Sequence, residues 1–419
     1  MTKSKPYAVV HLVAQEALKD LIGPQVVDHM EVQASTPGDD KPERVVAAFL
    51  EPVRHAFTLR MRSQLREYRR RAPHMRVALL PYTSRCRSIL QNRLLGARLR
   101  PLIGDVPVVF HCRTESAAEW AVALSQFLPV TGIVLDVRGA WAEELVFANG
   151  FDGVESAPAD LREQFRAAEV RLCCALEAAA SVLTVSKGMV DYLEGFGVDG
   201  RLAYVPCCVR STTFSHSARM RMRAQLGLDG KLVYVYAGTV TRYQHVEDGL
   251  LAFFGLAAEQ TPDTHLLCLT NDTERLRAAI ASARIDPERV TLRGALQREM
   301  PDLLAAGDAG LLLRAPSRMN RFSQPTKFAE YLAAGLPVLV SRGTGVLDDM
   351  VETHGAGMAI DWFGSSLDHR RELVRQTCMR FRARGADMRV AALRLCEAEF
   401  LWSKYVSTVR QAYARAIAQ

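Results

Sequence analysis

Short, β-branched apolar runs recur along the whole chain and alternate with segments of helical spacing. Alternation of this kind predicts right-handed βαβ units on a parallel sheet. The runs of the first half are 8–13, 44–49, 76–80, 108–111, 132–136, 181–185 and 202–205. Those of the second half are 232–236, 265–269, 289–292, 309–313 and 337–340. The sequence therefore predicts an α/β fold with two doubly wound, Rossmann-like sheets.

The strongest helical pattern lies over 160–180, where apolar residues recur at steps of three or four. Such spacing places them on one face of a helix, which we expect to be buried. The five residues are Leu161, Phe165, Ala168, Leu172 and Leu176. Beyond Ser365 the chain is predicted to be helical to its end, with Phe400, Trp402 and Tyr405 as apolar anchors.

The alternation lapses over 207–216, in a segment that a basic helix over 218–226 follows. We place the boundary between two domains there. The predicted organisation is an N-terminal domain over 1–210 and a C-terminal domain over 211–385. The remaining residues, 386–419, are predicted to form helices that pack back on the N-terminal domain. Two tandem α/β domains are expected to bind ligands in a cleft between the carboxyl ends of their sheets.

The chain carries 53 Lys and Arg against 46 Asp and Glu, a net charge of +7. Its nine cysteines include no Cys-x-x-Cys pair, so neither a disulfide framework nor a zinc site has the spacing it needs. No window reaches the roughly 18 uninterrupted apolar residues of a spanning helix. We expect a cytoplasmic protein that is at most peripheral at the inner face of the membrane.

The excess charge is local, because the stretch from Arg54 to Arg100 holds thirteen arginines and a single acid, Glu67. One interpretation is a solvated helix face whose arginine stems cover apolar neighbours. The other is a docking surface for an anionic membrane or an acidic substrate. Nucleic acid is not an expected partner, because the stretch has few aromatic residues and no nucleic-acid module accompanies it.

The segment with the clearest chemistry runs from Arg314 to Val338, where a strand ends, a polar loop follows and a helix begins near Pro325. Free N–H groups at a helix start bind anions. Lys327 adds a full positive charge in the first turn, which the helix dipole disfavours unless an anion is bound. Glu330 lies three residues later on the same face and is able to accept hydrogen bonds from a sugar diol. Ser323 or Gln324 is predicted to lie near the cap of this helix.

The run Pro-Thr-Lys-Phe-Ala-Glu-Tyr-Leu-Ala-Ala-Gly-Leu-Pro-Val, from Pro325 to Val338, resembles the nucleotide-sugar site of retaining GT-B glycosyltransferases of the family-four type, glycosyltransferase group 1. It matches a subgroup that also carries Asp-x-Arg-Gly. The resemblance implies that Glu330 binds the ribose hydroxyls of the donor. It also implies that the preceding loop and the helix start, with Asn320, Ser323, Pro325 and Thr326, contact the diphosphate and the donor sugar.

The resemblance extends upstream to the turn after the first strand of the C-terminal domain. The broad family often has arginine directly after the glycine and lysine five residues later, whereas this chain has Thr239 after Gly238, and Gln244 at the lysine position. Arg242 and Lys327, with help from Arg314, are then the predicted source of charge for the diphosphate. Arg293 and Gly294 resemble the turn near which the base lies.

In the N-terminal half, His111-Cys-Arg113 and Asp136-Val-Arg138-Gly139-Ala-Trp141-Ala-Glu143-Glu144 resemble the acceptor side of the same subgroup. Many relatives have His-Gly where this chain has Arg138 and Gly139. Arginine cannot serve as a base, so Arg138 is predicted to stabilise the donor phosphate or to orient the acceptor. Asp136 is predicted to hold Arg138. His111 is either a core histidine bonded to backbone or a residue of the cleft.

The resemblance therefore predicts an enzyme that moves a sugar from a nucleotide-diphosphate sugar to an acceptor hydroxyl with retention of configuration. Catalysis would rest on Asp136, Arg138, Arg242 and Lys327, with His111, Arg113, Trp141 and Glu144 on the acceptor side. The family usually needs no metal, and none is expected. The acceptor is a glycan, a lipid-linked sugar or a small molecule, in polysaccharide synthesis. The alternatives are a non-catalytic binding or scaffold subunit and a transferase for a small-molecule or protein acceptor.

Overall fold

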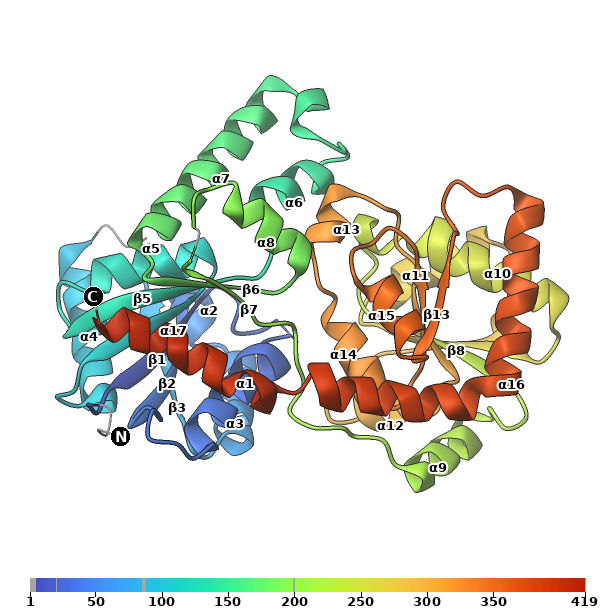
Figure 1. Cartoon of the computed structure of the whole chain (residues 1–419), viewed down its shortest axis with the longest axis horizontal. Helices are drawn as coiled ribbons and strands as arrows, with labels where there is room; N and C mark the ends of the chain where they lie inside the picture. Colours follow the sequence, from blue (N-terminus) through green and yellow to red (C-terminus); the bar gives the residue numbers. More distant parts are fainter. Residues whose placement is uncertain (1–4, 20, 85–87, 199, 419) are drawn as a thin grey trace. The chain divides into compact units, whose positions relative to one another are not determined.

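The computed structural model describes residues 5–19, 21–84, 88–198 and 200–418. These residues form two units, each with its own sheet (Figure 1). Unit 1 comprises 1–146, 154–210 and 401–419, and unit 2 comprises 147–153 and 211–400. Each unit has helices on both faces of a parallel sheet, so the predicted α/β architecture is confirmed.

The sheet of unit 1 has seven parallel strands in the order β3-β2-β1-β4-β5-β6-β7. Its strands are β1 (Ala8–Ala14), β2 (Arg44–Pro52), β3 (Arg76–Tyr82), β4 (Val108–Arg113), β5 (Val130–Val137), β6 (Ser181–Thr184) and β7 (Leu202–Tyr204). Its α-helices are α1 (Asp28–Ser35), α2 (Val53–Ala56), α3 (Leu59–Arg71), α4 (Ile89–Ile103), α5 (Thr114–Leu124), α6 (Trp141–Ala148, which continues into unit 2), α7 (Ala159–Ala178), α8 (Lys187–Glu194) and α17 (Val406–Ala418).

The sheet of unit 2 has six parallel strands in the order β10-β9-β8-β11-β12-β13. They are β8 (Leu232–Ala237), β9 (Thr264–Leu269), β10 (Val290–Arg293), β11 (Ala309–Leu312), β12 (Val338–Ser341) and β13 (Gly357–Ile360). Its α-helices are α9 (His216–Leu226), α10 (Ala252–Gln260), α11 (Thr273–Ser282), α12 (Met300–Ala305), α13 (Arg318–Phe322), α14 (Thr326–Ala333), α15 (Leu347–Thr353) and α16 (Leu367–Glu399).

The predicted apolar face of the helix over 160–180 is confirmed, because all five residues named for it are buried on α7. The strand β13 was not predicted. Its four residues, Gly357–Ile360, include a single β-branched residue, Ile360, and begin with a glycine.

The C-terminal segment differs from the predicted division at 385/386, because that point falls inside α16. The chain passes from unit 2 to unit 1 between Phe400 and Leu401 instead. Phe400 packs against Phe328 in unit 2, with ring centroids 5.3 Å apart, and Trp402 stacks on His29 in unit 1 at 4.3 Å. A short 3-10 helix (Trp402–Tyr405) separates the two long helices, so the end of the chain is not continuously helical.

Helix α17 lies across the sheet of unit 1 and packs against β4, β5 and β6 (Figure 1). It closes an apolar cluster that includes Val9, Val109, Trp402 and Tyr413. The last residues of the chain therefore complete the core of the N-terminal unit. Among the described residues, no helix is both long and apolar enough to span a bilayer.

Candidate functional site

In unit 2, the strand order reverses between β8 and β11. Gly238 directly follows β8, and Arg314 lies two residues beyond β11. Open α/β sheets bind ligands in the crevice that such a reversal leaves at the carboxyl edge. The predicted donor-site glycine and arginine therefore lie at the point of unit 2 where a ligand is expected.

Two buried cations converge on one neutral side chain at this point. Lys327 donates from Nζ to Oε1 of Gln244 at 2.8 Å, and Arg314 donates from Nη2 to the same oxygen at 3.1 Å. Lys327 is 7% exposed and Arg314 is 5% exposed. The amide of Gln244 has no net charge, so the acceptor that these cations share does not neutralise them. The pair is suited to binding an anion.

The pKa values of the two cations reflect the same environment. Burial lowers the pKa of Lys327 well below its ordinary value; the charge of Arg314 lowers it further, while Glu330 acts in the opposite direction. Burial also lowers the pKa of Arg314. A bound anion would relieve this penalty, because an opposite charge nearby favours the protonated form.

Gly238 provides the room in which Lys327 reaches this position. Its φ of +149° is one that side-chain-bearing residues rarely adopt, and an added Cβ would collide with Nζ of Lys327. The ammonium of Lys327 also lies over the ring of Tyr236, 4.8 Å from its centroid. Tyr331 accepts a hydrogen bond from the backbone N–H of Ala237 at 2.8 Å and thereby ties α14 to the end of β8.

The helix that carries Lys327 and Glu330 begins at Thr326, with Pro325 as its N-cap. Ser323 and Gln324 directly precede this cap, as predicted, and no side chain bonds to the first turn there. Ser323 instead bonds to the carbonyl of Asn320 and accepts from Arg314, both at 3.4 Å. The backbone N–H groups in the first turn of α14 therefore have no side-chain cap. An anion site requires such uncapped N–H groups.

Asn320 has a mainly structural environment in the preceding loop. It is 2% exposed, and its Nδ2 donates to the carbonyl of Ala315 at 2.9 Å. Its Oδ1 is buried and has no hydrogen-bond partner among the described residues. Direct contact of Asn320 with a donor therefore stays a prediction.

Arg242 and Arg293 do not share the partner of Arg314 and Lys327; each contacts other residues. Arg242 donates to the carbonyl of Phe147 at 2.8 Å and to Asp152 at 3.1 Å. Arg293 is partly exposed and lies 3.7 Å from Glu299, at the end of β10, where Gly294 follows. Thr239 accepts a hydrogen bond from Tyr236 through its carbonyl at 2.6 Å. The predicted diphosphate role of Arg242 would require it to leave the 147–153 segment.

In unit 1, the strand order reverses between β1 and β4. Arg113 ends β4 and donates from Nε to Glu16 at 2.8 Å, while its buried Nη1 has no hydrogen-bond partner among the described residues. The backbone is strained here, because Gln15 and Thr114 have φ values of +61° and +69°. Such strain in non-glycine residues clusters at functional sites.

Asp136 and Arg138 form a buried ion pair at the end of β5, as predicted. Arg138 donates from Nη1 to Asp136 at 3.4 Å and from Nη2 to Oε1 of Gln25 at 2.7 Å. Burial alone would raise the pKa of Asp136, but the charge of Arg138 and the contact with His111 hold it well below its ordinary value. Asp136 is therefore ionised and is unsuited to accept a proton.

The remaining predicted acceptor residues have different environments. His111 is fully buried, and its Nδ1 lies 2.8 Å from the hydroxyl of Tyr413, so it bonds to a side chain and not to backbone. Trp141 begins α6 and is 51% exposed. Burial raises the pKa of Glu144, and the nearby carboxyl of Glu115 raises it further. A side chain at Gly139 would overlap the carboxylate of Glu144.

Residues that sequence reasoning did not assign hold the predicted ones in place. Gln244 was identified only as a departure from the family pattern, yet it accepts hydrogen bonds from both Arg314 and Lys327. Ser341 accepts from the backbone N–H of Arg314 at 2.8 Å. Glu16 binds Arg113, and Gln25 binds Arg138. A polar residue at the carboxyl end of a strand is the signal that would have found Glu16 and Ser341. Glu16 lies two residues after β1, and Ser341 is the last residue of β12.

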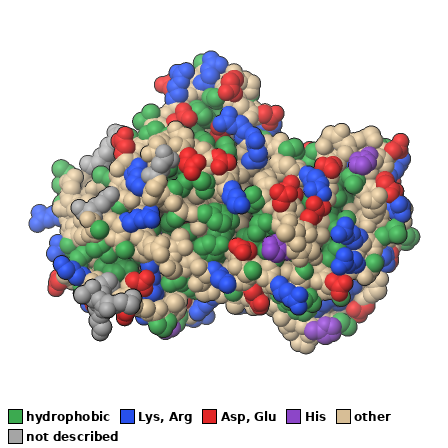
Figure 2. All heavy atoms as spheres, in the orientation of Figure 1, with side chains coloured by type: hydrophobic (Ala, Val, Ile, Leu, Met, Phe, Trp, Pro, Cys, Tyr) green, Lys and Arg blue, Asp and Glu red, His purple; other side chains and the backbone are tan. Residues whose placement is uncertain are grey.

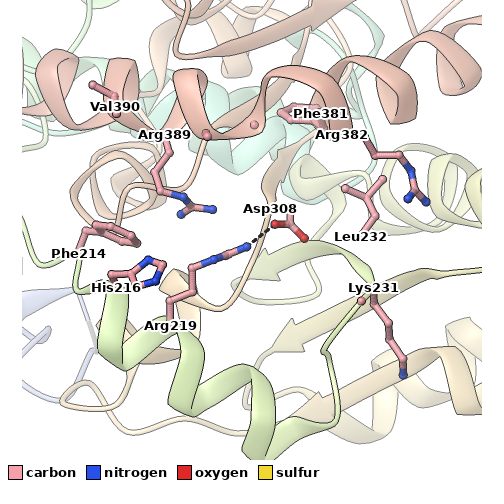
Figure 3. A pocket seen from close by; sticks show the side chains of 13 residues that line it. Phe214, His216, Arg219, Lys231, Leu232, Asp308, Phe381, Arg382, Arg389 and Val390 are labelled. Carbon is pink, nitrogen blue, oxygen red and sulfur yellow. Dashed lines mark hydrogen bonds and ion pairs between the residues drawn. The ribbon is translucent and has the colours of Figure 1, made fainter.

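A cavity of about 660 Å³ in unit 2 lies away from this site, near the amino ends of β8 and β11 (Figure 3). Arg219 and Arg389 are among its lining residues, and both donate to carbonyls that follow α12 or α14. Cations at the C-terminal ends of helices are favoured by the helix dipole. These arginines therefore stabilise helix ends, and the cavity is separate from the Arg314–Lys327 pair.

The comparisons agree with the arrangement of unit 2. Residues 231–363, which include Gln244, Arg314 and Lys327, match the family model described as Glycosyl transferases group 1. No curated protein matches the chain. Together with the two doubly wound sheets, the solved structures below show that the protein has the GT-B fold, and the family match shows that residues 231–363 resemble the glycosyl transferases of group 1.

Solved structures of this fold match nearly the whole chain. Anabaena Alr3699/HepE in complex with UDP-glucose shares 15% identity, with 98% of this chain and 99% of that chain covered and a TM-score of 0.64. Sucrose-phosphate synthase from Thermosynechococcus elongatus shares 16% identity over 98% and 99%, with a TM-score of 0.63. WaaG, a glycosyltransferase involved in lipopolysaccharide biosynthesis, shares 14% over 96% and 98%, with a TM-score of 0.62.

Proposed function

We propose that the protein transfers a sugar from a nucleotide-diphosphate sugar to an acceptor hydroxyl with retention of configuration, in the synthesis of a cell-surface polysaccharide or glycoconjugate. Unit 2 holds the donor and unit 1 supplies the acceptor side. The transfer takes place on the cytoplasmic side of the membrane. HepE, which shares the fold, is solved with UDP, with UDP and glucose, and with UDP-glucose.

The observation that carries the proposal is the pair of buried cations that share Gln244. A cation in a protein interior is costly unless an opposite charge or several hydrogen bonds compensate it. Here two cations, on separate elements, share a neutral acceptor at the carboxyl edge of the sheet. A diphosphate supplies the missing negative charge, and its position beside the start of α14 adds backbone N–H donors.

The chemistry follows from these charges. During transfer, the bond from the anomeric carbon to the diphosphate oxygen breaks while the acceptor oxygen bonds to that carbon on the same face. The acceptor proton passes to the departing diphosphate oxygen. Arg314 and Lys327 stabilise the negative charge that develops there, and positioning of the acceptor supplies the rest of the acceleration. No protein base is needed, which fits an ionised Asp136 paired with Arg138.

Glu330 is assigned to the ribose, and its replacement tests the donor site. Glu330→Ala should weaken donor binding about tenfold to a hundredfold, because it removes a charged acceptor of two hydroxyl hydrogen bonds. The affinity of the free nucleoside should fall by the same factor, since the contact is to the ribose. Isothermal titration with nucleotide sugars, and release of nucleoside diphosphate as the turnover assay, measure both effects.

A matched control is Glu372→Ala, which removes an exposed carboxylate of α16 that pairs with Arg375. It should leave donor affinity and turnover as in the wild type. Unchanged donor affinity in Glu330→Ala would contradict the assignment of the ribose site. Absence of nucleoside diphosphate release with every nucleotide sugar tested would contradict the transferase function itself and favour a non-catalytic binding subunit.

We further propose that unit 1 meets an anionic membrane that carries a lipid-linked acceptor. Two segments that follow the neighbouring strands β2 and β3 expose large apolar side chains, with Phe57 56%, Leu59 83% and Ile89 72% exposed. Exposed arginines of α3 and α4 surround them, among which are Arg60 and Arg93. Figure 2 shows basic side chains next to hydrophobic ones on the side of unit 1 in view. Apolar anchors with cationic neighbours are typical of interfacial binding.

Not every arginine of the stretch takes part in this surface. Arg71 is bound to Asp28 by two hydrogen bonds, and Arg76 and Arg100 donate to backbone carbonyls. Arg85 and Arg87 lie outside the described residues. The membrane surface is therefore defined by the apolar residues Phe57, Leu59, Ile89, Leu90 and Leu94 with the exposed arginines Arg60, Arg62, Arg66, Arg93 and Arg98.

Replacing Phe57 and Leu59 with serine should reduce binding to anionic vesicles about tenfold or more, because two apolar side chains no longer enter the interface. Co-sedimentation with vesicles of phosphatidylglycerol and phosphatidylcholine measures this. Val170→Ser removes an exposed apolar side chain of α7, 62% exposed, and should have no effect. Equal binding of the wild type to neutral and anionic vesicles would leave the solvated helix face as the correct interpretation.

A further inference from the structure

Three histidines are packed in the interior of unit 1, between its sheet and the C-terminal segment. His11 and His111 are register partners on β1 and β4, and His29 lies on α1. All three are at most 1% exposed. Burial lowers the pKa values of His11 and His29 well below their ordinary range, and proximity to His111 lowers them further. These two rings are therefore neutral at physiological pH.

A continuous line of polar contacts runs from Tyr413 to Arg138 through this cluster. The hydroxyl of Tyr413 lies 2.8 Å from Nδ1 of His111, and Nε2 of His111 lies 3.6 Å from Oδ2 of Asp136. Asp136 in turn holds Arg138 at 3.4 Å through its other oxygen. Tyr413 is 302 residues from His111 in the sequence, so the last helix of the chain reaches the ion pair at the end of β5.

The direction of these contacts follows from the carboxylate. Nε2 of His111 and Oδ2 of Asp136 are too far apart for a hydrogen bond, but a carboxylate charge at 3.6 Å attracts an N–H and repels a lone pair, so it favours the tautomer with the proton on Nε2. Nδ1 is then an acceptor, and the hydroxyl of Tyr413 donates to it. His111 thus acts on Oδ2 of Asp136 through charge, while Oδ1 accepts a hydrogen bond from Arg138.

The ring of His111 has little freedom to turn. His11 stacks on it with centroids 4.2 Å apart and planes 15° apart, and His29 meets it edge-on at 5.6 Å. His29 is itself stacked on Trp402. The neutral rings thus fix the orientation of His111 without adding charge beside Asp136.

Metal binding is a second interpretation of this cluster, because His11, His111 and Asp136 offer ligand atoms within 4.8 Å of one another. Two features disfavour it. The lone pairs of nearly parallel, stacked rings do not converge on one point, and Arg138 already neutralises the only carboxylate of the group. A divalent ion would therefore add uncompensated charge in a buried place.

We propose that Tyr413 and His111 are positioning residues for Arg138 and act through Asp136. This proposal rests on the proposed function, in which Arg138 serves the transfer. The chain from Tyr413 fixes the tautomer of His111, His111 holds the carboxylate of Asp136, and Asp136 fixes the guanidinium that Gln25 grips from the other side.

Tyr413→Phe tests the proposal, because it removes one hydroxyl and keeps the ring that packs in the core. We expect kcat to fall about tenfold, while the KM for the nucleotide sugar stays within about twofold because the donor site lies in unit 2. Tyr7→Phe is the matched control. Tyr7 packs in the same cluster, but its hydroxyl donates to the carbonyl of Asp40 and not to His111. It should leave kcat unchanged.

A double-mutant cycle separates positioning from a general loss of structure. In an Arg138→Lys background, Tyr413→Phe should cause no further loss of kcat, because the residue on which it acts is already altered. Additive losses would overturn the proposal. If Arg138→Lys itself leaves turnover intact, the assignment of Arg138 in the proposed function fails instead, so the two failures are distinguishable.

Nitrogen-15 NMR of the histidine side chains gives a readout that needs neither activity nor a variant. The wild type should show His111 with a proton on Nε2. A proton on Nδ1 would overturn the proposal even where Tyr413→Phe does not fold. Elemental analysis of the purified protein provides a third outcome, because one bound transition-metal ion per chain, lost in His111→Gln, would establish the metal site instead.

Discussion

Replacing Lys327 with alanine should lower kcat/KM for the nucleotide sugar about 10²-fold to 10³-fold, the range expected when one preorganised charge contact to the leaving group is lost. The reason lies in the pair of cations that share Gln244. With Lys327 gone, Arg314 alone stabilises the diphosphate. Binding of the free nucleoside should hardly change, because the ammonium is assigned to the phosphates. Steady-state kinetics and calorimetric titration with nucleoside, nucleoside diphosphate and nucleotide sugar measure the difference.

The stability of Lys327→Ala should distinguish a ligand site from a structural contact. Burial lowers the pKa of Lys327, which means that folding works against its charge. Removal of the side chain should therefore leave the melting temperature of the ligand-free protein unchanged or raise it. A structural lysine would show the opposite. Lys231→Ala, on the other edge of the same sheet, is the control and should affect neither property.

The pH dependence has a definite sign. Since its pKa is lowered, Lys327 loses its proton at a lower pH than an ordinary lysine does, so donor affinity of the wild type should weaken as the pH rises through that lowered pKa. Lys327→Ala should lack this dependence. Equal losses for nucleoside and nucleotide binding would contradict the diphosphate role of Lys327.

The helix that carries Lys327 and Glu330 was predictable from the sequence because its signals are local. Pro325, Lys327 and Glu330 lie within one turn and a half, and the dipole argument for an anion needs only their order along the chain. Its partner Gln244 was not predictable as such. It lies 83 residues away and reaches Lys327 only because β8 and β11 are neighbours in the sheet.

Arg242 shows the opposite case. Its spacing after Gly238 suggested a phosphate contact, but the left-handed turn at His245 and the segment 147–153 direct it elsewhere. Spacing in a loop does not determine where a long side chain points. Apart from β13, the paired strands of the two sheets were predictable, since each lies in a short apolar run of its own. The contact of Tyr413 with His111 was not, because it depends on the C-terminal helix returning to unit 1.

Arg138→Lys is expected to have the second large effect on turnover. Lysine keeps a positive charge beside Asp136, so the buried carboxylate stays compensated and the fold should survive. The planar guanidinium, however, donates to Asp136 and Gln25 at once, and an ammonium on a shorter reach cannot reproduce that geometry. We expect kcat to fall about 10²-fold, with donor affinity as in the wild type.

The charge state of Arg138 makes this prediction specific. Burial acts against its charge, but Asp136 raises its pKa above the ordinary value, so the guanidinium is never a base. Arg138→Lys should therefore lower kcat by the same factor from neutral to mildly alkaline pH, whereas loss of a proton acceptor would change the shape of the profile. Gln25→Glu, which keeps the grip on Arg138 and adds a counter-charge, should retain most of the turnover. A kcat in Arg138→Lys equal to that of the wild type would show that this arginine only stabilises unit 1.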